Sequence, residues 1–297
     1  MADFSPENRK SAIWATDARK IAAGRAVDVW LEKTGQKEIE DISHLEPVQW
    51  GLRLQEPIAR AVGDRLNVRL KELDIEGTHR QHPWMRSHFD YISDDGQTLY
   101  EVKNYNAYNR DKYGADGSQD IQAADWAQCV HEAAVMGVKQ ITLCVLFGGQ
   151  ELCLYPLTID DAMTEALIQQ EAALWAQVQT QQPPEPQHPD DARAIYPVSH
   201  ERFTIARPDI EAACMKLKQI KQAIKQMEEQ EEILQGMIMG TMQDASVLQS
   251  TGGQVLATWK SAKESQRFDS ARFKAEMPKV YEQYVASVPG SRRFLVK

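Results

Sequence analysis

The stretch Met85–Lys103, MRSHFDYISDDGQTLYEVK, decides the fold. It predicts two short strands joined at Asp95-Gly96, because Asp-Gly strongly favours a tight hairpin turn. In that register Asp90 stands directly opposite Glu101, and the alternation of side chains along a strand puts Glu101 and Lys103 on one face. The two carboxylates would then lie about 5 Å apart between their Cβ atoms, a like-charge pair that destabilises a sheet.

Such a pair needs compensating positive charge. Lys103 supplies one charge, and a hard divalent cation bound by both carboxylates would supply the rest. An isolated Glu-x-Lys is far more often part of a surface salt-bridge ladder, since such tripeptides arise by chance in charged chains. Here the flanking residues are apolar or aromatic, which favours a half-buried sheet and a metal site: Phe89, Tyr91, Ile92, Leu99, Tyr100 and Val102.

Two more polar residues extend this pattern. Glu56, in Gln55-Glu-Pro57 on an expected helix, adds a third acid upstream, and Gln128 lies on an expected helix downstream. Together the residues resemble the PD-(D/E)xK nuclease fold and, within it, the phage lambda exonuclease/YqaJ-type recombinase (alkaline exonuclease) family. The resemblance covers roughly residues 9–180. It implies an α/β fold, a restriction-endonuclease-like mixed sheet flanked by helices, with a helical plus small β C-terminal extension.

The resemblance implies roles for the residues around the hairpin. Asp90, Glu101 and the carbonyl of Val102 would bind Mg²⁺, with Mn²⁺ able to substitute. Lys103 would orient and help deprotonate the attacking water, for which it must be neutral. A nearby metal that lowers the pKa of this lysine is therefore part of the hypothesis.

Four residues outside the hairpin have roles that rest on the same resemblance. Glu56 would hold a metal-bound water or a second cation, and Gln128 would reach the active centre near the DNA phosphate. Arg9 and Thr16 match the spacing of a family pattern that binds the 5′-terminal phosphate. An arginine fork and a helix N-terminus suit a phosphate. A solvated arginine beside an ordinary helix cap explains the same two residues equally well.

Charge limits how the chain could hold nucleic acid. The 297 residues are 42% hydrophobic and 26% charged, and the formal net charge of −9 is the wrong sign for coating DNA indiscriminately. Any DNA contact must come from a local basic surface. The loop after Lys103 interleaves tyrosines with Arg110 and Lys112, which suits a nucleic-acid strand. A plain solvated loop is at least as good an interpretation.

Periodicity and composition predict the domain organisation. We expect a nuclease core over 1–182, a Pro-rich connector or wrapping arm over 183–207, and a C-terminal extension over 208–297. Core helices are expected over 17–31, 50–70, 120–137 and 160–182, and strands over 140–147 and 151–157. Pro57 also allows the second helix to begin near Gln55. In the extension, apolar residues at steps of three and four from Ala213 to Ile238 indicate a coiled-coil-like stripe that Glu231 interrupts. Strands over 254–260 and 266–268 and a helix from Asp269 should follow.

Other features bear on the compartment. No run of 18 apolar residues occurs, and no basic-then-apolar leader opens the chain. We therefore expect a soluble protein that does not bind membranes and is cytoplasmic in a bacterial or phage-infected cell. The cysteines lack paired spacing and read as reduced thiols: Cys129, Cys144, Cys153 and Cys214.

The leading hypothesis is an Mg²⁺-dependent 5′-to-3′ exonuclease. It would degrade one strand of linear double-stranded DNA from its ends, giving 3′ overhangs for recombination by strand annealing. The resemblance alone gives the direction, a single-strand annealing protein as partner, and a cyclic homo-oligomer of three or four subunits. A restriction-like DNA endonuclease and a non-catalytic DNA-end-binding assembly protein are the alternatives.

Overall fold

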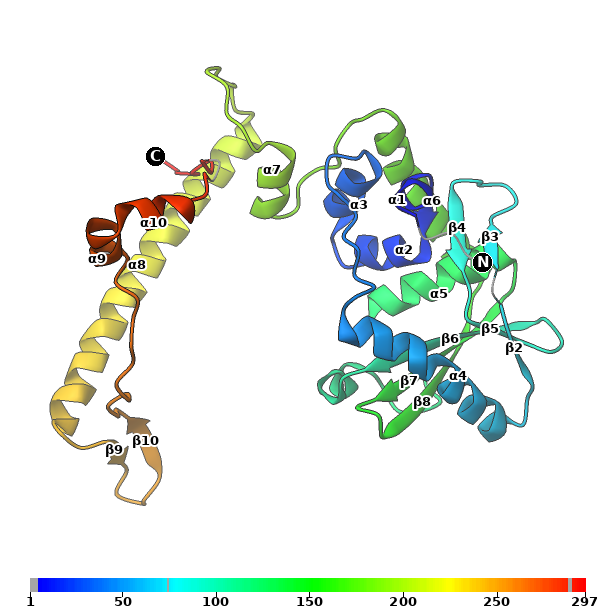
Figure 1. Cartoon of the computed structure of the whole chain (residues 1–297), viewed down its shortest axis with the longest axis horizontal. Helices are drawn as coiled ribbons and strands as arrows, with labels where there is room; N and C mark the ends of the chain where they lie inside the picture. The colour runs from blue at the N-terminus through cyan, green and yellow to red at the C-terminus, as the bar shows by residue number, and fades with distance from the viewer. Residues whose placement is uncertain (1–4, 74, 288–289) are drawn as a thin grey trace. The chain divides into compact units, whose positions relative to one another are not determined.

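The computed structural model describes residues 5–73, 75–287 and 290–297. It divides into two compact units, Met1–Tyr196 and Pro197–Lys297 (Figure 1). The division falls inside the segment 183–207. Part of that segment forms helix α7 (Pro189–Ile195), which packs on the first unit through Ile195, so this part is an arm and not a free linker.

The first unit is built on a mixed five-stranded sheet in the order β2-β5-β6-β7-β8. Strands β6 and β7 pair in parallel, and the remaining neighbours are antiparallel. The strand bounds are Leu70–Glu72, Tyr91–Ser93, Thr98–Tyr105, Gln140–Phe147 and Glu151–Thr158. The expected mixed α/β fold is confirmed, and the buried strand expected over 140–147 has those bounds.

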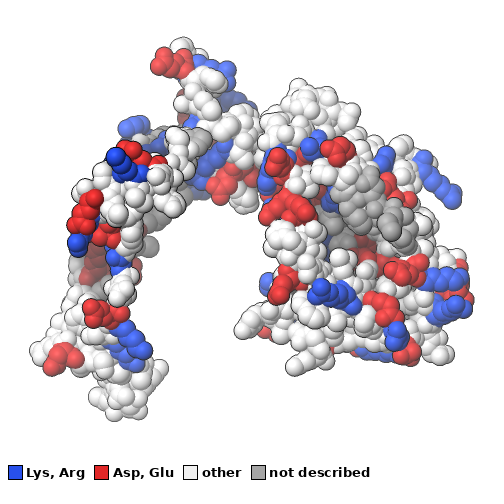
Figure 2. Space-filling view, viewed as in Figure 1, with Lys and Arg blue, Asp and Glu red and all other residues white. Residues whose placement is uncertain are grey.

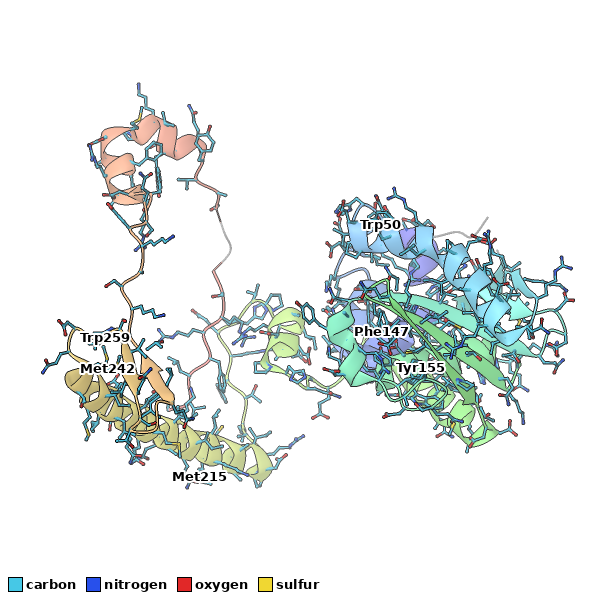
Figure 3. All side chains as sticks on the ribbon, turned by 90° about the horizontal axis from the view of Figure 1, so that it is seen from below. Trp50, Phe147, Tyr155, Met215, Met242 and Trp259 are labelled. Atoms are coloured by element: carbon cyan, nitrogen blue, oxygen red, sulfur yellow. The ribbon has the colours of Figure 1, made fainter. Side chains whose placement is uncertain are left out.

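Helices cover both faces of this sheet. On β6, Tyr100 and Val102 pack with Ile58 and Val62 of α4 (Glu46–Leu66) in one apolar cluster. Leu99 points to the other face and lies in a separate cluster with residues of α5 (Ala123–Met136) and α6 (Asp161–Gln179). Because side chains alternate along a strand, Glu101 and Lys103 also point toward α5. Figure 3 labels Phe147 and Tyr155 within this unit and Trp50 on α4.

A second, three-stranded sheet adjoins the first in the order β1-β4-β3. Its strands are Ile13–Trp14, Met85–His88 and Glu76–Thr78. Three N-terminal helices pack around it: α1 (Pro6–Lys10), α2 (Ala15–Ala22) and α3 (Ala26–Lys33). The single helix expected over 17–31 is wrong. The chain turns between α2 and α3 at Gly24, whose φ of +76° suits glycine.

The predicted register of the central hairpin is confirmed. Tyr91 pairs with Tyr100 and Ile92 with Leu99, which sets Asp90 opposite Glu101. The turn is longer than the expected Asp95-Gly96 pair and spans residues 94–97, with Gly96 at a φ of +73°. The incoming strand is also interrupted, because β4 belongs to the small sheet and β5 to the large one. Asp90 therefore lies where the chain crosses from one sheet to the other.

Helix α4 begins earlier than either sequence-based alternative. It starts at Glu46, ends at Leu66, and carries Pro57 in its interior. A proline there removes one helical hydrogen bond. The helix nevertheless continues through Pro57, and Ile58, Ala59 and Val62 just after it are buried against the sheet.

The second unit contains the long helix α8 (Pro208–Met242), followed by a hairpin of β9 (Val247–Gln249) and β10 (Val255–Thr258). The strand that pairs with β10 is thus β9, which lies before Gly253. Residues 266–268, where a second strand was expected, do not form one. Helix α9 (Ser270–Glu276) is capped by Asp269 as expected, and α10 (Pro278–Gln283) follows. Figure 3 shows Met242 and Trp259 near the hairpin.

Two sequence features have simple structural outcomes. Cys129, Cys144 and Cys153 are buried and Cys214 is exposed, all with free thiols. Within the described ranges, none of the helices has the length and apolar character needed to cross a membrane.

Candidate active site

A cavity of about 550 Å³ is bounded by residues of α4, β4, β6 and α5. Predicted site residues form much of its polar wall: Asp90, Glu101, Lys103 and Gln128, joined by Glu132. Arg9 and Thr16 line the same cavity. The structure therefore brings together six of the residues that the sequence singled out.

Asp90 is held on both sides of its carboxylate. Its Oδ2 accepts a hydrogen bond from the backbone N–H of Val102 at 2.8 Å, and its Oδ1 accepts one from the side-chain amide of Gln55. Its backbone carbonyl accepts from the N–H of Leu73 at 2.9 Å. Burial, and then the charge of Glu101, raise the pKa of Asp90 well above its usual range.

Glu101 is the centre of a second set of contacts. The side chain is buried, and its Oε1 accepts from the Nζ of Lys103 and, at 2.5 Å, from the Nε2 of Gln128. The same Nε2 donates to Oε1 of Glu132 at 2.8 Å. Gln128 and Glu132 are four residues apart on α5, so they lie on one face of that helix. One amide thus bridges two buried carboxylates.

The charges of this cluster are unevenly compensated. Burial, and then the charge of Glu101, raise the pKa of Glu132 well above its usual range. For Lys103, burial by itself would lower the pKa, but the charge of Glu101 opposes this, with Tyr105 and Asp90 contributing, and the net shift is upward. In the metal-free protein Lys103 is therefore a cation. One lysine faces three carboxyl groups, which leaves room for further positive charge.

The donor set fits a hard divalent cation. The strand register sets Asp90 opposite Glu101, and the charge of Glu101 helps to raise the pKa of Asp90, so a bridging cation would relieve the repulsion between the two carboxyl groups. Two carboxylates and the carbonyl of Val102 would supply the oxygen ligands that Mg²⁺ takes in proteins. In the part of the chain that the structure describes, no group of three or more His, Cys, Asp or Glu residues is arranged to hold a metal. The fit therefore rests on two side chains and one main-chain oxygen.

The structure does not bring Glu56 into the cavity. Its side chain is exposed, pairs with Arg60 at 2.5 Å, and lines a different depression of about 510 Å³. The preceding residue, Gln55, points to Asp90. Consecutive helical residues differ by about 100° in direction, so a phase error of one residue moves a side chain out of the site. The third carboxyl group in the cavity belongs to Glu132.

Arg9 and Thr16 come from two different helices, α1 and α2, and meet at the cavity wall. The Nη2 of Arg9 donates to the Oγ1 of Thr16 at 2.6 Å. The guanidinium also lies 5.3 Å from the ring centroid of Trp14, a cation–π distance. The two residues paired by sequence spacing are therefore paired in space.

The loop cations have other partners. Arg110 lies in the 3₁₀ helix η1 (Ala107–Lys112), pairs with Glu151 at 2.8 Å and donates to the carbonyls of Tyr113 and Gly114, both at 3.0 Å. These bonds hold the loop against the sheet. Lys112 is exposed and donates to the Asn109 side chain at 3.0 Å. Arg110 is thus occupied within the fold.

Sequence reasoning missed a network behind Gln128. Arg19 donates to the hydroxyl oxygen of Tyr105 at 2.9 Å, to the buried carboxylate of Asp125, and to Oε1 of Gln128 at 3.3 Å. Because Oε1 accepts from Arg19, the amide nitrogen of Gln128 is left to face the carboxylates. Nothing in the local sequence around Arg19 indicates this role. Glu132, by contrast, could have been found from its spacing to Gln128.

His131 lies on α5 beside the cluster. It is fully buried, with Nδ1 at 2.9 Å from the carboxylate of Glu171 and Nε2 at 3.0 Å from the carbonyl of Arg86. Burial alone would lower its pKa, but the Glu171 carboxylate opposes this and the pKa is raised. Both ring nitrogens face acceptors, which suits the protonated imidazolium. The residue joins α5, α6 and β4.

One family model matches the part of the chain that contains most of these residues. Residues 6–139 match the model of the YqaJ-like viral recombinase domain. The matched residues include Arg9, Thr16, the hairpin residues and Gln128. No curated protein sequence matches the chain.

Three solved structures that match the chain at low identity are described as exonucleases. An alkaline exonuclease from Laribacter hongkongensis is 13% identical, with a TM-score of 0.48 over 59% of this chain and 91% of that one. The same enzyme in complex with dAMP gives 13% identity, the same coverage and a TM-score of 0.45. A phage-related exonuclease from Haemophilus somnus is 10% identical, with a TM-score of 0.41 over 56% of this chain and 82% of that one.

Proposed function

We propose that this protein is a metal-dependent deoxyribonuclease that degrades one strand of linear duplex DNA from the 5′ end. The 3′ single strand left behind would serve recombination by strand annealing. The observation that carries the proposal is the facing pair Asp90 and Glu101, with Lys103 beside it, in a cavity of a YqaJ-like domain. The substrate is the end of double-stranded DNA.

Asp90, Glu101 and the carbonyl of Val102 would hold Mg²⁺, for which Mn²⁺ can substitute. When bound, such a cation polarises the scissile phosphate and stabilises the leaving oxygen. A carboxyl group must be deprotonated to bind a metal ion, so the raised pKa of Asp90 couples metal binding to the loss of the Asp90 proton.

The surrounding side chains orient the reacting groups. Lys103, whose Nζ donates to Glu101, would bind the attacking water or a phosphate oxygen. As a cation it stabilises negative charge, and it becomes a base only if nearby positive charge lowers its pKa. The amide of Gln55 fixes Asp90, and Gln128, itself fixed by Arg19, fixes Glu101. The DNA phosphate would enter between these two amides.

Arg9 and Thr16 would bind the 5′-terminal phosphate. Their side chains already meet at 2.6 Å on the wall of the cavity that contains Asp90 and Glu101. A guanidinium can offer two parallel donors to a phosphate, and the hydroxyl adds a third. An anchor at the end nucleotide would set the direction of digestion as 5′ to 3′.

Processive digestion by this chain requires more than bulk electrostatics. The formal net charge is −9, and acidic and basic side chains are interspersed on the face shown in Figure 2. Enclosure of the duplex by a cyclic homo-oligomer of three or four subunits would keep the enzyme on its substrate. Such a ring uses heterologous interfaces between neighbouring subunits. A single-strand annealing protein would be the partner that receives the 3′ strand.

The test uses linear duplex DNA labelled at either end and covalently closed circles, each with Mg²⁺ or with chelator. Release of the 5′ label as mononucleotide, from linear DNA alone and only with the cation, is the expected result. Fragments cut from circles would indicate the restriction-like endonuclease. Tight binding to ends without any cleavage would indicate the non-catalytic assembly protein.

A further inference from the structure

Helix α8 carries a row of apolar side chains that its own unit leaves open to solvent. Ile220, Ile224 and Leu234 are 46%, 49% and 58% exposed. The helix is continuous over 35 residues, about 50 Å at 1.5 Å per residue (Figure 1). A long helix gains most of its stability from burying an apolar face. This one therefore needs a partner.

The spacing of the row identifies the kind of partner. From residue 210 to residue 241 the steps alternate between three and four, the average of 3.5 that keeps a seam facing a second helix in a left-handed coiled coil. In heptad terms, Ile210 takes position a and Ala213 position d. The complete seam consists of Ile210, Ala213, Leu217, Ile220, Ile224, Met227, Glu231, Leu234, Ile238 and Thr241.

We propose that α8 pairs with α8 of a second copy of this chain, in antiparallel orientation. The charges on the helix change sign along its length: the first half carries Lys216, Lys218, Lys221 and Lys225, and the second half carries Glu228, Glu229, Glu231 and Glu232. In an antiparallel pair the basic half of each copy meets the acidic half of the other. The charge pattern of α8 is thus complementary to that of a second α8 in antiparallel orientation.

The seam positions distinguish the two orientations. In a parallel pair in register, position a faces position a, so Glu231 would meet Glu231 of the second copy inside the seam. Position g would meet the following e, so Lys216 would face Lys221 of the second copy. Both contacts are repulsive and one of them is buried. A parallel pair is therefore disfavoured at two points.

The antiparallel register removes both repulsions while overlapping the whole seam. Position a then packs on position d, so Ile224 meets Met227 and Leu217 meets Leu234 of the second copy. Glu231 faces Ile220 instead of a second carboxylate. Of the flanking e positions, Lys221 faces Glu228, and the twofold axis repeats this ion pair.

This contact is independent of the proposed nuclease function. It is isologous, with the same surface used by both copies, so it joins chains in twos and does not by itself close a ring. If the first units form rings, the α8 contact pairs two rings, and otherwise it gives a dimer. In both cases loss of the contact halves the mass of the particle.

The first experiment measures that mass by light scattering on the full chain. Ile224→Lys places a charge at the centre of the seam, and lysine is a good helix former, so the helix itself is preserved. The control is Met215→Lys on the same helix (Figure 3), at heptad position f, which faces away from the seam. We expect Ile224→Lys to halve the mass and Met215→Lys to leave it unchanged. Equal masses for all three proteins would overturn the proposal.

The second experiment determines the orientation. Lys221→Glu sets like charges face to face in the antiparallel pair, and should weaken association about tenfold or more at low salt. The double variant Lys221→Glu with Glu228→Lys exchanges the partners and should restore it. In a parallel pair Lys221→Glu would instead face Lys216 and strengthen association. That opposite sign would overturn the antiparallel assignment.

A cross-linking experiment gives the register. Cys214 is exposed and, at position e, faces Gln235 of the second copy, whereas Cys129, Cys144 and Cys153 are buried. Gln235→Cys should therefore give covalent dimers with a short bismaleimide. The two positions on one helix lie about 30 Å apart and cannot be bridged within a chain. Wild type and the control Cys214→Ser with Gln235→Cys should not cross-link, and equal dimer yields from all three would contradict the register.

Discussion

Gln55 and Glu56 are consecutive on α4, yet only Gln55 reaches the candidate active site. The Gln55 amide donates to Oδ1 of Asp90, whereas Glu56 is exposed and paired with Arg60. The interior of the site is therefore completed by an amide from α4 and by the carboxyl group of Glu132 from α5. This relationship separates residues that position the acids from residues that merely lie nearby in the sequence.

Substitution of the two neighbours should have unequal effects on cleavage. Gln55→Ala removes a hydrogen bond to a carboxylate, and we expect turnover to fall by about 10- to 100-fold. Glu56→Ala removes an exposed ion pair and should change turnover by no more than about twofold. Initial rates on linear duplex DNA measure both. Equal losses for the two variants would show that α4 contributes Glu56 after all.

Asp90→Asn tests whether the facing carboxyl groups form a cation site, apart from catalysis. Burial beside Glu101 disfavours the charge of Asp90. In the presence of chelator, the variant with a neutral amide should therefore be as stable as wild type or more stable. Added Mg²⁺ should raise the melting temperature of wild type, because a ligand of the folded state stabilises it. The same addition should leave Asp90→Asn unchanged. A collapse of the fold in Asp90→Asn would assign Asp90 a structural role.

The buried pair of His131 and Glu171 predicts how stability varies with pH. The folded pKa of His131 lies above its ordinary value, so the pair contributes fully below about pH 6.5 and is lost as pH rises through the folded pKa. Below about pH 6.5, Glu171→Gln should lower the free energy of unfolding by about 3 kcal/mol, because it leaves the buried charge of His131 unpaired. Urea unfolding at several pH values checks this.

The control for that series is Glu165→Gln, an exposed position on the same helix. It should follow the wild-type profile throughout. The difference in the free energy of unfolding between wild type and Glu171→Gln should narrow as the pH rises from about 6.5 through the folded pKa of His131. A difference that stays constant, or widens, would contradict a charged His131.

Arg9→Ala addresses the terminal phosphate. We expect the rate on 5′-phosphorylated duplex to fall by about 10- to 100-fold, the value of a charge-assisted contact, while the rate on 5′-hydroxyl duplex changes little. The matched control is Arg60→Ala, since this exposed arginine pairs with Glu56 outside the cavity. Equal loss on both kinds of end would remove the phosphate role of Arg9.

How far the sequence predicts this site depends on the distance over which each contact acts. Alternation and an Asp-Gly turn sufficed to set Asp90 opposite Glu101, because the two strands are adjacent in the chain. Glu56 was chosen on the family resemblance, but the structure directs the preceding residue, Gln55, to Asp90. Pro57 also made the start of α4 ambiguous. A sequence pattern can predict that a helix exists even when its boundary is uncertain. A shift of one residue, however, brings a different side chain into the site.

Contacts between distant segments were beyond reach of the sequence pattern. Arg19 meets Asp125 across 106 positions, and His131 meets Glu171 across 40. No local signal marks either pair, because each depends on how α2, α5 and α6 pack together. Arg110 was interpreted from its neighbours in a polar loop, while its partner Glu151 comes from β8.

The most direct test of the central claim is the initial rate of nucleotide release from linear 5′-phosphorylated duplex by wild type, Asp90→Asn, Glu101→Gln and Lys103→Ala. With Mg²⁺ the wild type should be active, and with chelator it should be inactive. The three variants, with folding verified by circular dichroism, should each lose at least about 100-fold in turnover. Wild-type rates in folded Asp90→Asn and Glu101→Gln, or undiminished cleavage in chelator, would contradict a metal-dependent nuclease centred on this pair.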